Sequence, residues 1–237
     1  MILIRKAVAE FIGTALLVAT VIGSGIMATN LTDDVGMQLL ANSVITGGIL
    51  VALILTLQPI SAAFNPIVTA VDTLLSRGSW RDASCLALAQ FAGGTLGAIV
   101  ANLMFDHSAV SFATHERTGA GVWLGEVVAT FGLVVVIFGA VRSGRTNTLA
   151  FAVAGYIVAA YWFTSSTSFA NPAVTVARMF SDSFAGIQPM SVPMFVVMQV
   201  IGAAAAVVAI RLLFPHPAPS GVPIAQTSAT TNRTDAS

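Results

Sequence analysis

The sequence predicts an all-α membrane protein in which six transmembrane helices and two re-entrant half-helices form an inverted repeat. Three observations carry this prediction: the composition, six long apolar stretches and a duplicated Asn-Pro motif. Of the 237 residues, 56% are hydrophobic and only 8% are charged, whereas about a quarter of the residues in a soluble domain are charged. Ten basic residues balance ten acidic ones. The sequence therefore has no strongly basic face that would bind a nucleic acid. The expected partner is the lipid bilayer.

Six apolar stretches have the length of roughly 20 residues that crosses a bilayer. They lie at about 8–28, 38–58, 83–105, 121–141, 148–163 and 192–214. The first follows Arg5 and Lys6 and superficially resembles a secretory signal. It is longer than the apolar region of a signal peptide, so we expect a transmembrane helix there. At the end of the fifth stretch, Tyr161, Trp162 and Phe163 are expected to anchor the membrane interface.

The basic residues predict the orientation of the chain, because cytoplasmic loops carry an excess of Lys and Arg. With the amino terminus inside, only Arg117 and Arg178 fall outside. The basic residues on the cytoplasmic side are then Arg5, Lys6, Arg77, Arg81, Arg142, Arg145, Arg211 and Arg233. We therefore expect a multi-pass protein of the cell membrane, inner or plasma, with both termini in the cytoplasm.

The Asn-Pro motif lies in two connections between spans that are too apolar for ordinary solvent-exposed loops. The runs NPIVTAVD (65–72) and NPAVTVAR (171–178) share Asn, Pro, Val and Thr at the same places. Their flanks also match, AEFIGT with GEVVAT and QFAGGTLGA with QVIGAAAAV. The two copies cover about 5–105 and 121–214. Because each contains three spans, the copies lie in the membrane with opposite orientations.

Each motif is expected to begin a short helix at membrane depth. Asn is a preferred N-cap residue, and Pro is favoured at the first helical position, where its missing N–H costs nothing. We predict half-helices at roughly 66–75 and 172–181. Irregular backbone is tolerated within a bilayer only where it is buried in protein or lines a water-filled cavity. The inverted copies therefore aim two helix N-termini, each carrying about half a positive charge, at one another near the midplane.

Six spans in an inverted repeat with two facing Asn-Pro half-helices resemble the major intrinsic protein family, the aquaporins and glycerol facilitators. The resemblance covers about residues 5–214 and implies an aquaporin-like channel domain over 1–214, usually a homotetramer with one pore in each subunit. It also implies that the two Asn side chains donate hydrogen bonds to passing solutes. The motif residues are Asn65, Pro66, Ile67, Asn171, Pro172 and Ala173. Ile67 stands where the family usually has Ala.

Two acidic residues lie within the spans. The resemblance implies that Glu10 and Glu126, in the first and fourth spans, hold the two re-entrant loops in place. Carboxylates inside a membrane are costly and usually functional, so proton coupling by either residue is the alternative. Their matched places in the repeat favour the bracing role.

In the family, the narrowest point of the pore lies outward of the Asn pair and is formed by four positions. One of them is an arginine three residues after the second Asn. Counted without gaps, the resemblance places Ile45, Ala159, Ser168 and Val174 at these positions. Because Val174 replaces the arginine, the filter should be wider and more apolar than that of water-selective or standard glycerol-selective members.

The change from Arg to Val also resembles a bacterial branch associated with arsenic resistance. Undissociated arsenite, As(OH)3, is neutral and similar in shape to glycerol. It and methylated arsenicals are therefore expected solutes beside glycerol-like molecules and water, with urea, ammonia and other metalloids as alternatives. The rival functions are a weakly selective ion or anion channel and a proton-coupled transporter of small solutes.

Arg178 lies one helical turn beyond Val174 on the same face. One interpretation is that it restores a positive charge in the outer vestibule. The other is an interfacial arginine near a helix C-terminus, where a cation is favoured.

The rest of the sequence contains few candidates for catalytic, cofactor-binding or metal-binding residues. No nucleophile-and-base pair, phosphate-binding loop or metal cluster lies in the spans, so we expect no enzymatic activity, no cofactor and no metal. His107 and His115 in the outer loop are interpreted as part of a solvated loop, with a metal or pH-sensing site as the alternative. Residues 215–237 are rich in Pro, Ser, Thr and Ala and are expected to form a disordered cytoplasmic tail.

Overall fold

The computed structural model describes residues 2–215, and every regular element in that range is helical. The long helices are α1 (Ile2–Leu31), α2 (Val35–Leu57), α4 (Trp80–Met104), α5 (Ala120–Arg142), α6 (Leu149–Phe163) and α8 (Val192–Leu213). The short elements are the helices α3 (Pro66–Ser76) and α7 (Pro172–Arg178) and the 3-10 turns η1 (Thr146–Thr148) and η2 (Pro189–Ser191). The predicted fold of six spans and two half-helices is confirmed. Nearly all of the predicted tail, residues 216–237, lies outside the described residues.

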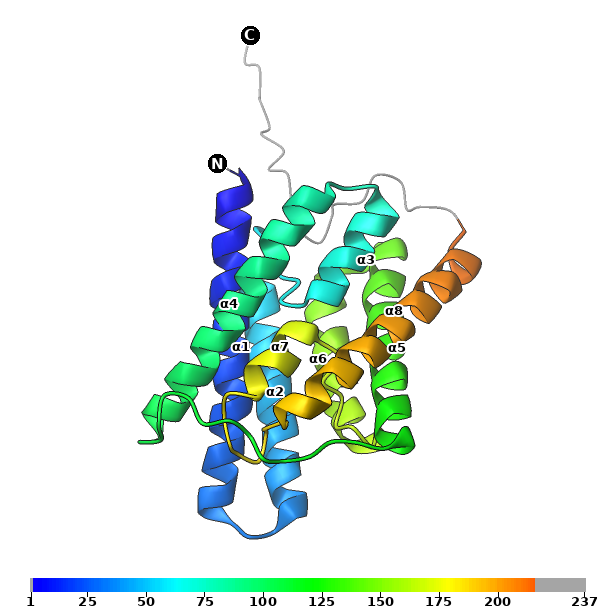
Figure 1. Ribbon diagram of the computed structural model, residues 1–237. Coiled ribbons are helices and arrows are strands. Elements are labelled where there is room, and N and C mark those ends of the chain that lie inside the picture. The colour runs from blue at the N-terminus through cyan, green and yellow to red at the C-terminus, as the bar shows by residue number, and fades with distance from the viewer. Residues whose placement is uncertain (1, 216–237) are drawn as a thin grey trace.

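The long helices run between two ends of the molecule, and the start of α1 marks what we call the amino-terminal end (Figure 1). Within the bundle, α1 packs along α4 and α5 packs along α8. The half-helices α3 and α7 approach the middle of the bundle from opposite ends, so that their first residues meet there (Figure 1). Two segments more than a hundred residues apart in the sequence thus form one central structure.

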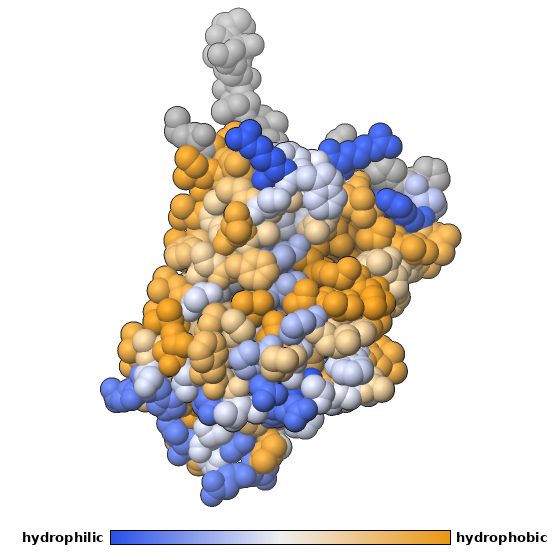
Figure 2. All heavy atoms as spheres, viewed as in Figure 1, coloured by the Kyte–Doolittle hydropathy of each residue, from blue (hydrophilic) through white to orange (hydrophobic). Residues whose placement is uncertain are grey.

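On the face shown in Figure 2, the surface of the bundle is mostly apolar along its length and more polar at its two ends. On α1, Ile4, Val8, Ile12 and Leu16 are exposed at four-residue spacing, which places them in one row along the helix. Six helical segments of the described range are long and apolar enough to cross a membrane. An exposed apolar row of this kind suits the interior of a bilayer, and the protein is an integral multi-pass membrane protein.

Glycines allow the two pairs of helices to pack closely. A Cβ atom at Gly93 or Gly97 of α4 would collide with the carbonyl groups of Phe11 or Ala15 of α1. In the second half of the chain, a Cβ atom at Gly202 of α8 would collide with the carbonyl oxygen of Val127 of α5. Small residues at four-residue spacing are a common means of bringing membrane helices into backbone contact.

The second half-helix is shorter than predicted. The sequence predicts a helix over 172–181, whereas α7 ends at Arg178. Beyond it, Met179 and Phe180 give their carbonyl oxygens to the N–H groups of Ala113 and Ser111, at 2.9 and 3.1 Å. The chain leaves the helix because the loop between α4 and α5 supplies these hydrogen-bond partners.

We expect Gly97→Ala to lower the midpoint of thermal unfolding in detergent by several degrees, because the added methyl group pushes α4 away from α1. Overpacking of this kind costs about 1–3 kcal/mol. Gly48→Ala is the matched control, since a Cβ atom there meets nothing within 4 Å and Ala is favoured over Gly in a helix by about 0.5–1 kcal/mol. Equal midpoints for the two variants would contradict the close-packing role of Gly97.

Candidate functional site

The two Asn-Pro motifs begin their half-helices in the same way. Asn65 is the N-cap of α3, and its Oδ1 accepts from the N–H of Ile67 at 2.9 Å. Asn171 is the N-cap of α7, and its Oδ1 accepts from Ala173 and Val174 at 3.0 and 3.2 Å. Pro66 and Pro172 occupy the first helical position. The cap satisfies backbone donors that the helix start leaves without intrahelical partners.

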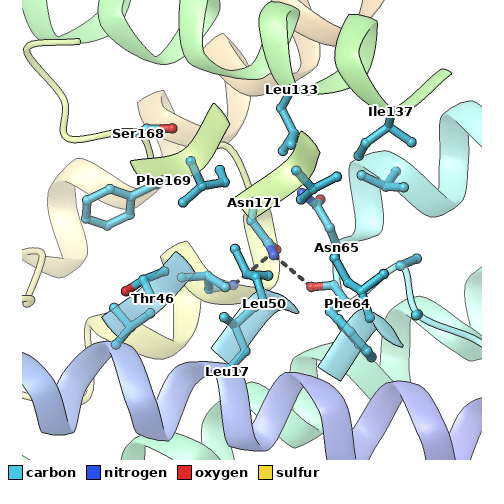
Figure 3. A pocket seen from close by; sticks show the side chains of 18 of the residues that line it. Leu17, Thr46, Leu50, Phe64, Asn65, Leu133, Ile137, Ser168, Phe169 and Asn171 are labelled. Atoms are coloured by element: carbon cyan, nitrogen blue, oxygen red, sulfur yellow. Dashed lines mark hydrogen bonds between the residues drawn. The ribbon is translucent and has the colours of Figure 1, made fainter. Parts of the chain in front are cut away.

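The same two amides join the half-helices across the centre of the bundle. Asn65 Nδ2 donates to the carbonyl oxygen of Ala170 at 2.8 Å. Asn171 Nδ2 donates to that of Phe64 at 2.7 Å (Figure 3). Each Nδ2 carries two N–H groups, and both Asn residues line the central cavity. One N–H group of each amide therefore fixes the other loop, and the second has no acceptor within residues 2–215.

In the first repeat, Glu10 of α1 holds the loop before α3. Its Oε1 accepts from the N–H of Ala63 at 2.9 Å and from the Ser61 hydroxyl, and its Oε2 accepts from the N–H of Phe64 at 2.6 Å. Gln90 Nε2 donates to the same carboxylate at 2.7 Å and to Thr69 Oγ1 at 2.9 Å. The fully buried carboxylate thus connects α1, the loop, α3 and α4.

The second repeat contains the same arrangement around Glu126 of α5. The N–H groups of Phe169 and Ala170 donate to its two oxygens at 2.8 and 3.0 Å. Gln199 Nε2 donates to Glu126 Oε2 at 2.6 Å and to Thr175 Oγ1 at 2.9 Å. Neither Glu126 nor Glu10 lines the central cavity.

These contacts hold strained backbone. Phe64 and Ala170, each immediately before the Asn of its motif, have φ angles of 49° and 47°. Residues other than glycine avoid this left-handed region, at a cost of roughly 1–2 kcal/mol each. Since the N–H of each strained residue donates to a buried carboxylate, the carboxylates stabilise the conformation that aims the Asn side chains.

A cavity of about 80 Å³ passes along the joined half-helices. Most of its wall is apolar, with Leu17 and Leu50 on one side and Leu133 and Ile137 on another (Figure 3). Its polar lining residues are Thr46, Asn65, Tyr161, Ser168, Asn171 and Arg178. A few fixed polar groups in an apolar wall are typical of sites that bind small molecules.

Two of the four predicted filter residues are wrong. Ile45 is 45% exposed, Ala159 is also exposed, and neither lines the cavity. Thr46 and Tyr161 lie in the wall instead, and Thr46 Oγ1 is 3.3 Å from the Tyr161 hydroxyl. The ungapped count is off by one residue in α2 and by two in α6. Each residue turns a helix by about 100°, so an offset of one or two residues exchanges the pore face for the lipid face.

A pattern in the sequence indicates that Thr46 faces the protein interior. Gln38, Asn42 and Thr46 follow one another at four-residue spacing, and polar residues in a span usually face the protein interior. All three are buried. Tyr161, interpreted from the sequence as an interfacial anchor, is also buried, whereas its neighbour Trp162 is exposed.

Ser168, Val174 and Arg178 all line the cavity. The Ser168 hydroxyl is buried and has no hydrogen-bond partner in the described part of the chain. Arg178 is only 2% exposed, so it does not lie at a lipid-water interface. Its guanidinium lies over the ring of Phe169, 3.4 Å from the centroid, and its Nε donates to the carbonyl oxygen of Ala185.

The remaining predicted polar groups lie apart from this cavity. His107 and His115 are exposed, and within residues 2–215 no three acidic, His or Cys side chains are grouped as metal ligands. A second hollow of about 310 Å³, lined by Lys6, Asp72 and Asp82 among others, shares Ala63 and Val68 with the central cavity. It places polar groups toward the amino-terminal end.

Six apolar spans around a cavity at which two half-helices meet define an integral membrane protein of the channel type. The family model for the Major intrinsic protein matches residues 1–164. Aquaglyceroporin AqpS of Rhizobium meliloti (strain 1021) is 48% identical over 212 residues, which cover 89% of this chain and 91% of that protein. The chain belongs to the major intrinsic protein family.

More distant proteins are also similar to this chain. Aquaporin NIP1-1 of Zea mays is 27% identical over 215 residues, covering 89% of this chain and 75% of that protein. The X-ray structure of the aquaglyceroporin from Plasmodium falciparum has a TM-score of 0.69 at 17% sequence identity, covering 90% of this chain and 98% of that chain. The similarity to the solved structure shows the shared fold.

We expect Glu126→Gln to lower the midpoint of thermal unfolding. Both Glu126 oxygens accept hydrogen bonds from N–H donors. Glutamine replaces one of these oxygens by an NH2 group, which cannot accept a hydrogen bond and would face an N–H donor. Hydrogen bonds to a charged group contribute about 1.5–3 kcal/mol. Glu116→Gln in the exposed loop is the matched control, since Glu116 accepts only from its neighbour Thr118. Indistinguishable midpoints for the two variants would contradict the bracing role.

Proposed function

We propose that this protein is a passive channel through which small uncharged solutes cross the membrane. The observation that carries the proposal is the central cavity, in which two helix N-termini and the Asn65 and Asn171 amides supply donors on an otherwise apolar wall. A neutral polar solute replaces its water contacts at these donors. An ion meets an apolar wall that cannot replace its hydration shell.

The narrow outer part of this path is formed by Thr46, Tyr161, Ser168 and Val174. All four line the cavity. Thr46 and Tyr161 bring hydroxyl groups to the passage and Val174 brings an aliphatic side chain, whereas the Ser168 hydroxyl is enclosed in the wall. Hydroxyl groups both donate and accept hydrogen bonds, so this set suits a solute that itself carries several hydroxyl groups.

Glycerol-like molecules are accordingly the proposed substrates, with arsenite and methylated arsenicals as the more specific proposal. The aquaglyceroporin name of the 48% identical relative supports passage of solutes larger than water. Val174 in place of the family's arginine leaves an apolar side of the passage that suits a methylated solute. As(OH)3 presents three hydroxyl groups and no charge.

The proton-coupled and ion-channel alternatives have less support. Glu10 and Glu126 accept hydrogen bonds from loop N–H groups and do not line the cavity. A proton carrier needs a carboxylate that contacts the solute path. We therefore propose that both carboxylates brace the loops, and that transport is passive and involves no catalysis.

The proposal includes an orientation and an assembly. Arg5, Lys6, Arg77 and Arg81 lie at the amino-terminal end of the bundle, which we assign to the cytoplasm by the excess of basic residues there. We place the protein in the plasma membrane, or inner membrane of a bacterium, as a homotetramer with one pore in each subunit.

We expect proteoliposomes with the native protein to pass water, glycerol and arsenite in stopped-flow light scattering. Val174→Arg puts a long cationic side chain into the passage, so glycerol and arsenite permeability should fall at least about tenfold while water still passes. Retention of full glycerol permeability in a correctly inserted Val174→Arg protein would remove Val174 from the filter.

The corrected positions in α2 allow a second test. Thr46→Leu adds bulk and removes a hydroxyl group within the passage, and we expect it to reduce glycerol permeability severalfold. Ile45→Leu is the matched control at the adjacent, exposed position and should leave the permeability unchanged. A loss of flux in Ile45→Leu with none in Thr46→Leu would reverse the assignment of the two faces.

A further inference from the structure

Among the described residues that line the central cavity, Arg178 is the one that carries a charge. It is held from two sides, because its Nε donates to the Ala185 carbonyl oxygen and its guanidinium stacks on the Phe169 ring. Stacking over an aromatic face is favourable for a guanidinium, and more so where water is excluded. The charge therefore has a fixed place in the wall.

The outer nitrogens of Arg178 remain available to a solute. Nη1 and Nη2 together carry four N–H groups, and within the described residues neither has a protein acceptor. Neither belongs to the fully enclosed polar atoms that lack a partner. These N–H groups thus reach the cavity surface.

A second arginine reinforces the positive charge behind the wall. The Arg117 guanidinium carbon lies 5.1 Å from the centroid of the same Phe169 ring, and its Nε donates to the Gly186 carbonyl oxygen at 2.9 Å. Burial lowers the pKa of Arg117 to about 10, so the side chain is still cationic at neutral pH. In residues 2–215 neither guanidinium forms an ion pair with a carboxylate. The buried Glu126 uses its oxygens on loop N–H groups and is absent from the wall.

We propose that Arg178 supplies the positive charge by which the outer part of this pore rejects cations, so that position 174 can remain aliphatic and leave room for a larger neutral solute. The inference rests on the proposed channel function and adds a determinant of its selectivity. Two unit charges about 6 Å apart at an effective dielectric constant near 20 repel by an energy that corresponds to roughly a 100-fold lower cation occupancy. The free Nη donors meanwhile remain able to bind the oxygens of a neutral solute.

The test compares Arg178→Gln, which removes the charge, with Arg178→Lys, which keeps it. Both are reconstituted as full-length protein, and K⁺ permeability is measured relative to glycerol permeability on the same vesicles. We expect the ratio of K⁺ to glycerol permeability to rise about 10- to 100-fold in Arg178→Gln and to return close to the native value in Arg178→Lys. Arg142→Gln is the matched control, because Arg142 donates to the Phe214 carbonyl oxygen at the amino-terminal end and does not line the cavity.

An unchanged ratio in an Arg178→Gln protein that passes glycerol normally would overturn the inference. If that variant does not insert, the native protein decides: a residual leak that favours Cl⁻ over K⁺ supports the assignment, and one that favours K⁺ overturns it. Absence of glycerol flux in the native protein is a different result, because it contradicts the proposed channel function itself.

Discussion

The structure depends on two buried carboxylates that hold irregular backbone in the middle of a membrane protein. Glu10 and Glu126 accept the N–H groups of residues 63, 64, 169 and 170, which have no neighbouring helix or strand to satisfy them. An unsatisfied polar backbone group in an apolar environment costs several kcal/mol. Without these acceptors, the left-handed residues before each Asn would not be maintained, and the half-helices would lose their starting points.

The geometry of the cavity follows from this constraint. Because each loop is fixed by its own carboxylate, Asn65 and Asn171 can reach across and donate to the carbonyl oxygen of the opposite loop. Two helix N-termini then face one another at a single depth, and each presents a partial positive charge to the path. The apolar side chains of the long helices close the remaining sides. Thr46 of α2 and Tyr161 of α6 add hydroxyl groups to the lining of the same cavity.

The part of the architecture that repeats in the sequence could be predicted from the sequence. The matched segments around Glu10 and Glu126, together with Gln90 and Gln199, occupy equivalent places in two copies, so local similarity leads to equivalent contacts. The register of Thr46 and Tyr161 could not be obtained by counting, because it depends on how many residues each loop needs to reach its Asn. The contact of Arg178 with Phe169 and Ala185 depends on the path of residues 179–188, which no local pattern specifies.

The central claim is that small uncharged solutes cross this protein passively through the cavity between the Asn motifs. The most direct measurement is the time course of radiolabelled glycerol uptake into proteoliposomes, with and without an imposed pH gradient, against protein-free vesicles. The account predicts uptake well above that of protein-free vesicles, an initial rate independent of the pH gradient, and a final internal concentration equal to the external one. Accumulation above the external concentration when the gradient is imposed would contradict it.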